Sequence, residues 1–208
     1  MKTVLITNIA NEFDAKLEEV FKREGYNVLS LNGLENINET IDAIKSGGWK
    51  LDYLLDTTDF SHIDDDYTIQ EDLDWDVSEA IFRKNVIAPM AMLEIFLPYL
   101  DLGNGKRLFY VTSATASINE TRSVTEYGYN MAKTALHQFI GLTRNKLAPL
   151  GYTLRVFDPM AGEVSPAAAA ESAFTYITRP RGTDGDDKKR NDEDNLVIWD
   201  ALGRQHSW

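Results

Sequence analysis

Short apolar runs alternate with stretches of helical periodicity along most of the chain, and this alternation limits the possible folds more than any other feature. The expected strands cover 2–7, 26–31, 51–56, 107–113, 152–158 and 196–200. The expected helices run from 13 to a stop near Gly25, from 37 to near Gly47, and over 78–98, 126–147 and 166–177. Strands that are separated by helices pair in parallel, so we expect an α/β fold with a doubly wound parallel sheet in three α/β/α layers.

The composition is that of one globular domain, and it excludes several classes of partner. Of the 208 residues, 43% are hydrophobic, which suffices for one core, and we expect a single domain over 1–208. The net charge of −12 argues against nucleic acid and membrane partners, because both attract basic surfaces. The charged range 178–195 is expected to form a mobile loop.

The sequence also carries few signs of a special compartment or of a metal. It contains no cysteine and no apolar run of the roughly 20 residues that cross a bilayer, and residues 2–7 read as a strand rather than a signal segment. We therefore expect a cytoplasmic protein. His62, His137 and His206 do not cluster with acids at a metal-ligand spacing, so no metal site is expected.

Residues able to carry chemistry follow four of the predicted strands. They are Thr7, Asp56, Ser113 and Asp158. Right-handed crossovers bring the carboxyl ends of parallel strands to the same edge of the sheet. Ligands bind at such an edge where the strand order reverses. We expect the functional site at this edge.

Tyr129 and Lys133 lie four residues apart in a predicted helix, so their side chains share one face. A phenol has a pKa near ~10, and an adjacent ammonium favours the phenolate, which brings proton exchange closer to neutral pH. The Ser113 hydroxyl could hold a carbonyl oxygen on which negative charge develops. An ordinary helix pair beside a loop serine remains the alternative interpretation, because this spacing is common.

The order Asn85, Ser113, Tyr129, Lys133 resembles the active site of the short-chain dehydrogenase/reductase family. The segments KRLFYVTSATAS and YNMAKTALHQFIGLTRNKLAPLGYTLRVFDP resemble the family's strand-plus-serine and helix-strand-proline segments. The resemblance covers residues 1 to about 165 and implies a Rossmann-like fold. It also implies hydride transfer between NAD or NADP and a small-molecule carbonyl or alcohol.

The resemblance assigns a role to each of these four residues. Tyr129 would exchange the proton, and Lys133 would lower the pKa of Tyr129 and hold the nicotinamide ribose. Ser113 would orient the substrate carbonyl, and Asn85 would support a water relay behind the lysine. Family members commonly pair through their two long helices, so the resemblance also implies a homodimer or a homotetramer. The residues expected to bind the cofactor are Thr7, Asn8, Ile9, Phe13, Asn32, Thr57, Tyr129, Lys133 and Pro159.

The chain departs from the family in the loop that should hold the cofactor diphosphate. The family has T-G-x-x-x-G-x-G there, and this chain has T-N-I-A-N-E-F-D, so Asn8, Glu12 and Asp14 fill the three glycine positions. Glycine permits the close approach of the backbone to a diphosphate. Two carboxylates at this point would instead repel it.

Two further departures concern the sheet and the loop after the third predicted strand. Only the 18 residues 33–50 separate Asn32 from Leu51, so we expect one strand-helix unit fewer than usual. The family's N-N-A-G is replaced by D-T-T-D at 56–59. Two functions therefore stay open: an oxidoreductase, or a non-catalytic binding, regulatory or subunit protein whose cofactor site has decayed.

Overall fold

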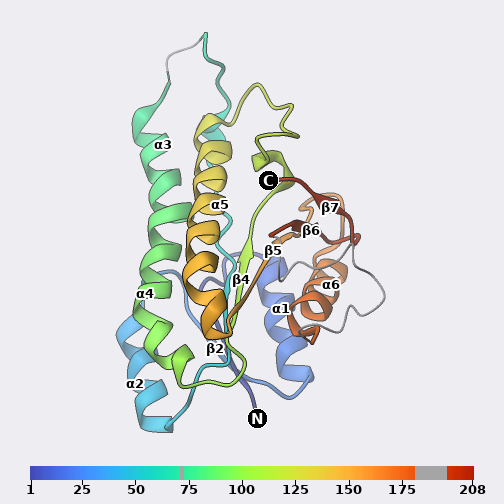
Figure 1. The fold of residues 1–208 in the computed structure, drawn as a ribbon. Helices are drawn as coiled ribbons and strands as arrows, with labels where there is room; N and C mark the ends of the chain where they lie inside the picture. The colour runs from blue at the N-terminus through green and yellow to red at the C-terminus, as the bar shows by residue number, and fades with distance from the viewer. Residues whose placement is uncertain (71–72, 181–195) are drawn as a thin grey trace.

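The protein folds around one mostly parallel sheet, as shown by a computed structural model that describes residues 1–70, 73–180 and 196–208 (Figure 1). In this part of the chain, seven strands pair in the order β2-β1-β3-β4-β5-β6-β7. All pairs are parallel except β6 with β7. The strands are β1 (Thr3–Ile6), β2 (Asn27–Ser30), β3 (Tyr53–Asp56), β4 (Arg107–Val111), β5 (Thr153–Asp158), β6 (Ile198–Asp200) and β7 (Gln205–His206).

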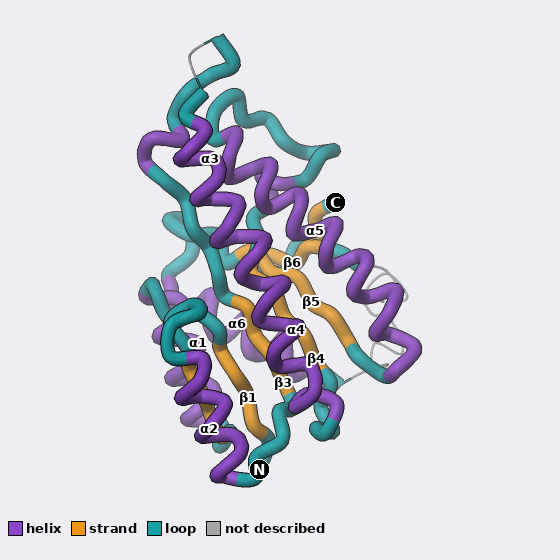
Figure 2. The backbone as a smooth tube through the Cα atoms, turned by 90° about the vertical axis from the view of Figure 1, so that its left-hand side faces the viewer, coloured by secondary structure: helices purple, strands orange, loops and turns teal. Residues whose placement is uncertain are grey.

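Helices cover both faces of this sheet, which confirms the doubly wound α/β fold. Helices α2, α4 and α5 lie on one face, and α1 and α6 lie on the other (Figures 1 and 2). The α-helices are α1 (Glu12–Arg23), α2 (Ile37–Gly47), α3 (Trp75–Phe82), α4 (Ala88–Asp101), α5 (Tyr127–Leu147) and α6 (Pro166–Thr178). Short helical turns are η1 (Ile63–Asp65), η2 (Arg83–Ile87), η3 (Ala114–Ala116) and η4 (Ala148–Leu150).

The two faces of the sheet are separated by the alternation of side chains along each strand. In β1, Leu5 packs into the core beneath α2, α4 and α5, whereas Val4 and Ile6 pack beneath α1 and α6. In β4, Leu108 and Phe109 divide between the two cores in the same way. This period of two is what a strand buried on both faces requires.

The predicted loss of one strand-helix unit is also borne out. A single helix, α2, connects β2 to β3, and β2 forms the edge of the sheet next to β1. The strand order therefore reverses around β1, whose neighbours are β2 and β3. The carboxyl ends of β1 and β3 consequently lie side by side at the expected ligand edge.

The long helix predicted over 78–98 differs from its prediction in two respects. It starts earlier, at Trp75, and the π-helical turn η2 interrupts it at Arg83–Ile87. It also continues through Pro98 to Asp101. Proline removes one helical hydrogen bond, but Phe96 and Leu100 are both fully buried on either side of it, and their burial outweighs that loss.

The C-terminal segment contains a feature that the sequence did not predict. After β6 the chain turns at Gly203, which has a φ of 78°, and β7 returns antiparallel to β6. The predicted mobile loop over 178–195 lies mainly outside the described residues, apart from Thr178, which ends α6, and the two residues that follow. No helix in the described part of the chain is long and apolar enough to cross a membrane.

Candidate active site

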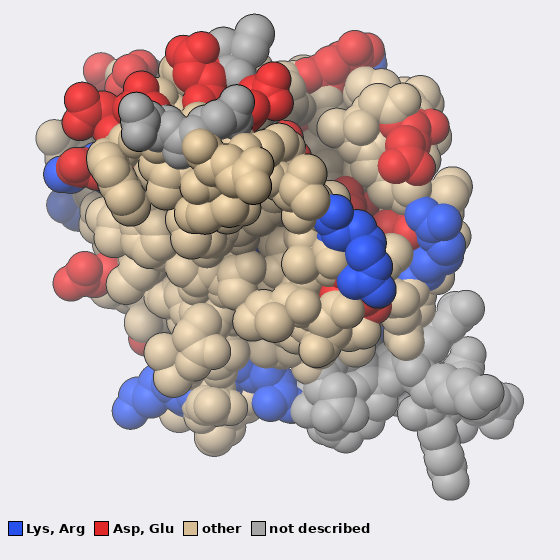
Figure 3. Space-filling model, turned by 90° about the horizontal axis from the view of Figure 1, so that it is seen from above, with Lys and Arg blue, Asp and Glu red and all other residues tan. Residues whose placement is uncertain are grey.

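Two cavities lie next to each other at the carboxyl edge of the sheet, the end of the molecule that Figure 3 shows. The first is a cleft of about 710 Å³ beside the ends of β1, β2 and β3, and Asn8, Asn32 and Thr58 line it. The second is a pocket of about 320 Å³ beside the ends of β4 and β5, and Ser113 and Tyr129 line it. Asp59 lines both cavities, so it stands at their junction.

Tyr129 and Lys133 come together on α5 as predicted, but both contact Asp59. The Tyr129 hydroxyl donates a hydrogen bond of 2.7 Å to Asp59 Oδ1, and Lys133 Nζ lies 3.1 Å from the same oxygen. Lys133 is fully buried and also donates to the carbonyl oxygens of Thr58 (2.7 Å) and Val111 (3.3 Å). The ammonium therefore already has acceptors from the protein itself.

This arrangement reverses the expected effect on the phenol. Burial and the adjacent Asp59 carboxylate raise the pKa of Tyr129 well above its ordinary value of 10.0. Burial by itself raises the pKa of Asp59, but the Lys133 ammonium and the Tyr129 hydrogen bond outweigh it, and the pKa of Asp59 lies below its ordinary value. Asp59 is thus the negatively charged group of the trio, and its charge holds the phenol in its protonated form.

Asn85 lies in the π-helical turn η2 and fixes the loop that carries Asp59. Its Nδ2 donates to the carbonyl oxygens of Phe60 (2.6 Å) and Ile81 (3.0 Å), and its Oδ1 accepts from the Phe60 backbone N–H (3.1 Å). Such turns recur at functional sites. The side chain of Asn85 therefore positions the backbone next to Asp59, and its predicted place in a water relay stays a prediction.

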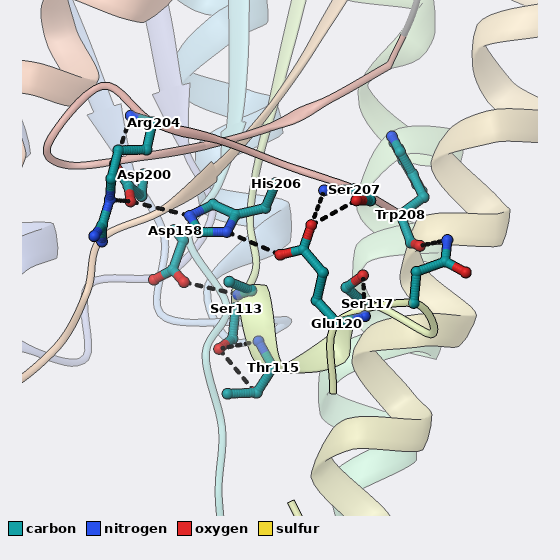
Figure 4. Close-up of polar contacts among 12 residues, drawn as sticks. Ser113, Thr115, Ser117, Glu120, Asp158, Asp200, Arg204, His206, Ser207 and Trp208 are labelled. Atoms are coloured by element: carbon teal, nitrogen blue, oxygen red, sulfur yellow. Dashed lines mark hydrogen bonds and ion pairs between the residues drawn. The ribbon is translucent and has the colours of Figure 1, made fainter. Parts of the chain in front are cut away.

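Ser113 follows β4 and shares the smaller pocket with Tyr129, which brings the predicted alcohol and phenol to one cavity. Its Oγ lies 2.9 Å from Thr115 Oγ1 (Figure 4). Asp158, at the end of β5, accepts hydrogen bonds of 2.7 Å from the backbone N–H groups of Ala114 and Met160. Burial raises the pKa of Asp158, and its two hydrogen bonds hold the loops on either side of the pocket in place.

The C-terminal strand closes the other side of this pocket (Figure 4). His206 lies between two carboxylates, with Nε2 3.0 Å from Asp200 Oδ2 and Nδ1 3.1 Å from Glu120 Oε2. Burial disfavours the charged ring, but these contacts outweigh it and raise the pKa of His206. Arg204 Nε also contacts Asp200 Oδ2, at 2.5 Å.

The residues expected to bind a cofactor divide into three groups. Asn8 and Asn32 line the larger cleft, and Tyr129 and Pro159 line the smaller pocket. Lys133 lies buried behind Asp59. The remaining four turn inward instead: they are Thr7, Ile9, Phe13 and Thr57. Phe13, for example, packs its ring against Phe157 in the core, because α1 buries that face against the sheet.

The loop at 7–14, where the family binds a diphosphate, contains the Asp14 carboxylate. Asp14 Oδ2 accepts hydrogen bonds from the backbone N–H groups of Ala10 (3.0 Å) and Asn11 (3.1 Å), and Asn11 Oδ1 accepts from the Asp14 N–H (3.0 Å). This capping box uses the amide hydrogens at the start of α1. Burial raises the pKa of Asp14 to about 6.

The two cavities have room for parts of a dinucleotide, but the groups around them do not all suit one. The larger cleft offers space for a nucleoside and combines neutral side chains with the charged Glu35, Asp59, Arg83 and Lys84. The smaller pocket offers a serine and a phenol. The first loop, which borders the larger cleft, does not fit a diphosphate in this conformation, because Asp14 takes up the N–H groups of Ala10 and Asn11. Among the residues that the structure describes, no three His, Asp or Glu side chains gather as metal ligands.

The sequence did not predict that Asp59 contacts Tyr129 and Lys133, or that His206 lies between Asp200 and Glu120. The only signal for Asp59 was the replacement of a family glycine by an acid in D-T-T-D, and nothing in the sequence connected it with Tyr129, 70 residues away. His206 follows a short turn in the last residues and gave no signal, because a two-residue strand has no measurable periodicity.

Comparisons with known proteins point in one direction. No protein-family model matches the chain. The short-chain dehydrogenase anuB of Penicillium roqueforti (strain FM164) is 30% identical over 133 residues, which are 63% of this chain and 41% of that relative. The chain thus spans less than half the length of this relative.

Solved structures of low sequence identity share the fold over the whole chain. A carbonyl reductase from Pseudomonas aeruginosa PAO1 in complex with NADP is 15% identical, with a TM-score of 0.72 and 100% of both chains covered. The carbonyl reductase Sniffer of D. melanogaster is 14% identical, with a TM-score of 0.74 and the same coverage. The chain therefore shares the fold of these carbonyl reductases and is similar in sequence to a short-chain dehydrogenase over 133 residues.

Proposed function

We propose that this protein is a short-chain dehydrogenase/reductase-like oxidoreductase that transfers hydride between NAD(P)(H) and a small-molecule carbonyl or alcohol. The observation that carries the proposal is the convergence of Ser113 and Tyr129 on one pocket, which adjoins a cleft large enough for a nucleoside. The relatives named above are a dehydrogenase and carbonyl reductases, one of them in complex with NADP, and they support the same reaction class.

Each side chain has a defined task in this proposal. Tyr129 exchanges a proton with the substrate oxygen, and Ser113 donates a hydrogen bond to that oxygen as charge develops on it. Lys133 supplies the positive charge beside the phenol, and Asn85 holds the backbone of the Asp59 loop. When bound, the nicotinamide would supply or accept the hydride, which no side chain of the protein can do.

A second candidate is a non-catalytic binding, regulatory or subunit protein, and two observations favour it. Asp14 takes up the N–H groups of the first loop, and Asp59 takes up both Tyr129 and Lys133. Asp14 thus satisfies backbone N–H groups, and Asp59 satisfies a phenol and an ammonium, of the kind that the family uses to bind its cofactor. A fold alone does not decide between the two functions.

Thermal unfolding with NADH and with NADPH at millimolar concentration separates the two candidates. A ligand that binds only the folded protein raises its Tm, so the oxidoreductase proposal requires a rise with one of the two cofactors. ADP-ribose serves as a control for binding that does not involve the nicotinamide. The absence of a rise with either cofactor, together with no turnover of carbonyl substrates, would leave the non-catalytic function.

We further propose a homodimer or a homotetramer that forms through the α4 and α5 faces, in a cytoplasmic protein of one domain. Ile87 and Met90 are exposed at the start of this face, at 48% and 41%, as are Met131 and Leu142 on α5. Such apolar side chains are typical of interfaces when they gather on one face. Light scattering tests the assembly, and replacing Met90 with Glu is expected to shift an oligomer toward the monomer.

A further inference from the structure

Asp59 occupies the junction of the two cavities, and its position there depends on a short, well-anchored loop. The loop leaves β3 at Asp56, and Asn85 binds the backbone N–H and carbonyl of Phe60 on the far side of Asp59. The Asp59 side chain keeps 23% of its area exposed, whereas that of Lys133 has none. A ligand entering either cavity therefore meets Asp59 before it can reach the lysine.

The contacts of Asp59 satisfy the same groups that the proposed reaction needs. One oxygen, Oδ1, accepts from the Tyr129 hydroxyl and pairs with Lys133 Nζ. The ammonium consequently faces a carboxylate rather than a ligand hydroxyl, and the phenol proton points at the carboxylate rather than into the pocket. The family that the chain resembles has a glycine at this position, and a glycine has no side chain that could make these contacts.

We propose that Asp59 is a positioning residue that keeps the Tyr129–Lys133 pair closed, so that any ligand using the pair must first displace the Asp59 carboxylate. The inference rests on the proposed function and adds to it the residue that limits cofactor affinity. Removal of the negative charge leaves Lys133 as the dominant charge beside the phenol. The phenol then ionises more readily, and the lysine becomes available to a ribose hydroxyl.

Other charged groups near the phenol act in the same direction as Asp59 but less directly. Asp158 and Glu126 also raise the pKa of Tyr129, and Asp65 accepts the Tyr129 backbone N–H. Lys133 is the cation next to the ring, at 5.6 Å from its centroid. Asp59 differs from these acids because, in the described part of the chain, it contacts both the phenol and the ammonium.

The test is a spectroscopic titration of Tyr129 in the full chain. Absorbance of tyrosinate is recorded against pH for the wild type and for Asp59→Asn, each with and without Tyr129→Phe, and the difference isolates the one phenol. Lys133 is oppositely charged to the phenolate, and such a neighbour lowers a pKa by about one to three units once no carboxylate neutralises it, so we expect Tyr129 to ionise at least about one unit lower in Asp59→Asn. Asp64→Asn, which removes an exposed charge in the same acidic region, is the matched control.

Cofactor binding is measured on the same proteins by the rise of Tm with NADH and NADPH. We expect Asp59→Asn to bind at least about tenfold more tightly than the wild type, corresponding to 1.4 kcal/mol, and Asp64→Asn to bind as the wild type does. Asp59→Ser, which leaves room for water at Lys133, replaces Asp59→Asn if that variant does not fold.

The outcomes distinguish this inference from the proposed function. An unchanged Tyr129 titration in both Asp59 variants overturns the inference, even if the wild type turns over a carbonyl substrate. An unchanged cofactor affinity in variants whose titration has moved overturns the claim that Asp59 limits binding. A moved titration without cofactor binding by any of the proteins supports the closed pair and overturns the proposed oxidoreductase function.

Discussion

Asp14 should make the stability of this protein depend on pH in a way that can be calculated. Its side chain is fully buried at the start of α1, and burial raises its pKa from 3.8 to about 6. The folded protein therefore holds this proton more tightly than the unfolded chain does. The resulting stabilisation is complete below pH 3.8 and is lost as the pH rises through about 6.

The magnitude follows from the difference between the two pKa values. A gap of about two pH units, at 1.36 kcal/mol each, corresponds to about 3 kcal/mol in total. Between pH 8 and pH 5 the linkage relation yields about 1.4 kcal/mol of this amount. The substitution Asp14→Asn removes the titration but retains an oxygen that can accept from the Ala10 and Asn11 N–H groups.

The assay compares urea unfolding of the wild type and Asp14→Asn between pH 5 and pH 8. Any constant effect of the amide cancels in the pH dependence of their difference, so only the lost titration remains. We expect the wild type to gain about 1.4 kcal/mol relative to the variant on acidification to pH 5. The exposed Asp64→Asn variant should show no such trend, and a difference for Asp14→Asn that stays flat within about 0.5 kcal/mol would refute the reasoning.

Three further predictions concern the site. Tyr129→Phe should abolish turnover of a carbonyl substrate while cofactor binding persists, as measured by initial rates and by the Tm rise; retained turnover would exclude Tyr129 as the proton donor. Lys133→Met should lower the free energy of unfolding by about 3–5 kcal/mol in urea unfolding, because Asp59 then keeps a largely buried charge without its cation. His206 has a raised pKa, so the stability from its contacts with Asp200 and Glu120 is present below the ordinary value of 6.5 and lost as the pH rises through the raised value. His206→Asn should remove that decline of Tm, and an unchanged profile would show that His206 does not hold the C-terminal strand.

The secondary structure could largely be predicted, because the local spacing of apolar residues differs between strands and helices. The apolar run at 107–113 became β4, buried on both faces, and the spacing of Phe13, Leu17 and Phe21 became the buried face of α1. The short stretch 33–50 likewise limited the chain to one helix between β2 and β3. The π-helical turn at Arg83–Ile87 was not predicted, because it depends on packing rather than on residue spacing.

The chemistry of the site could be predicted only in part. Ser113, Tyr129 and Lys133 were correctly expected at one edge of the sheet, because the ends of parallel strands must meet there. Phe13 and Thr57 were expected near a cofactor but point into the protein, since a helix or a strand end can present only one of its faces to a ligand.

The sequence by itself determined the order of strands and helices, the shortened sheet and the residues that could carry acid-base chemistry. Only the tertiary structure decided which partners the charged side chains contact. Asp14 caps its own helix, and Asp59 pairs with a lysine 74 positions further along the chain. Electrostatic interactions depend on distance and burial in space, which residue order does not specify, so only the folded chain could show that Asp14 accepts from the N–H groups of its own loop and that Asp59 contacts both Tyr129 and Lys133.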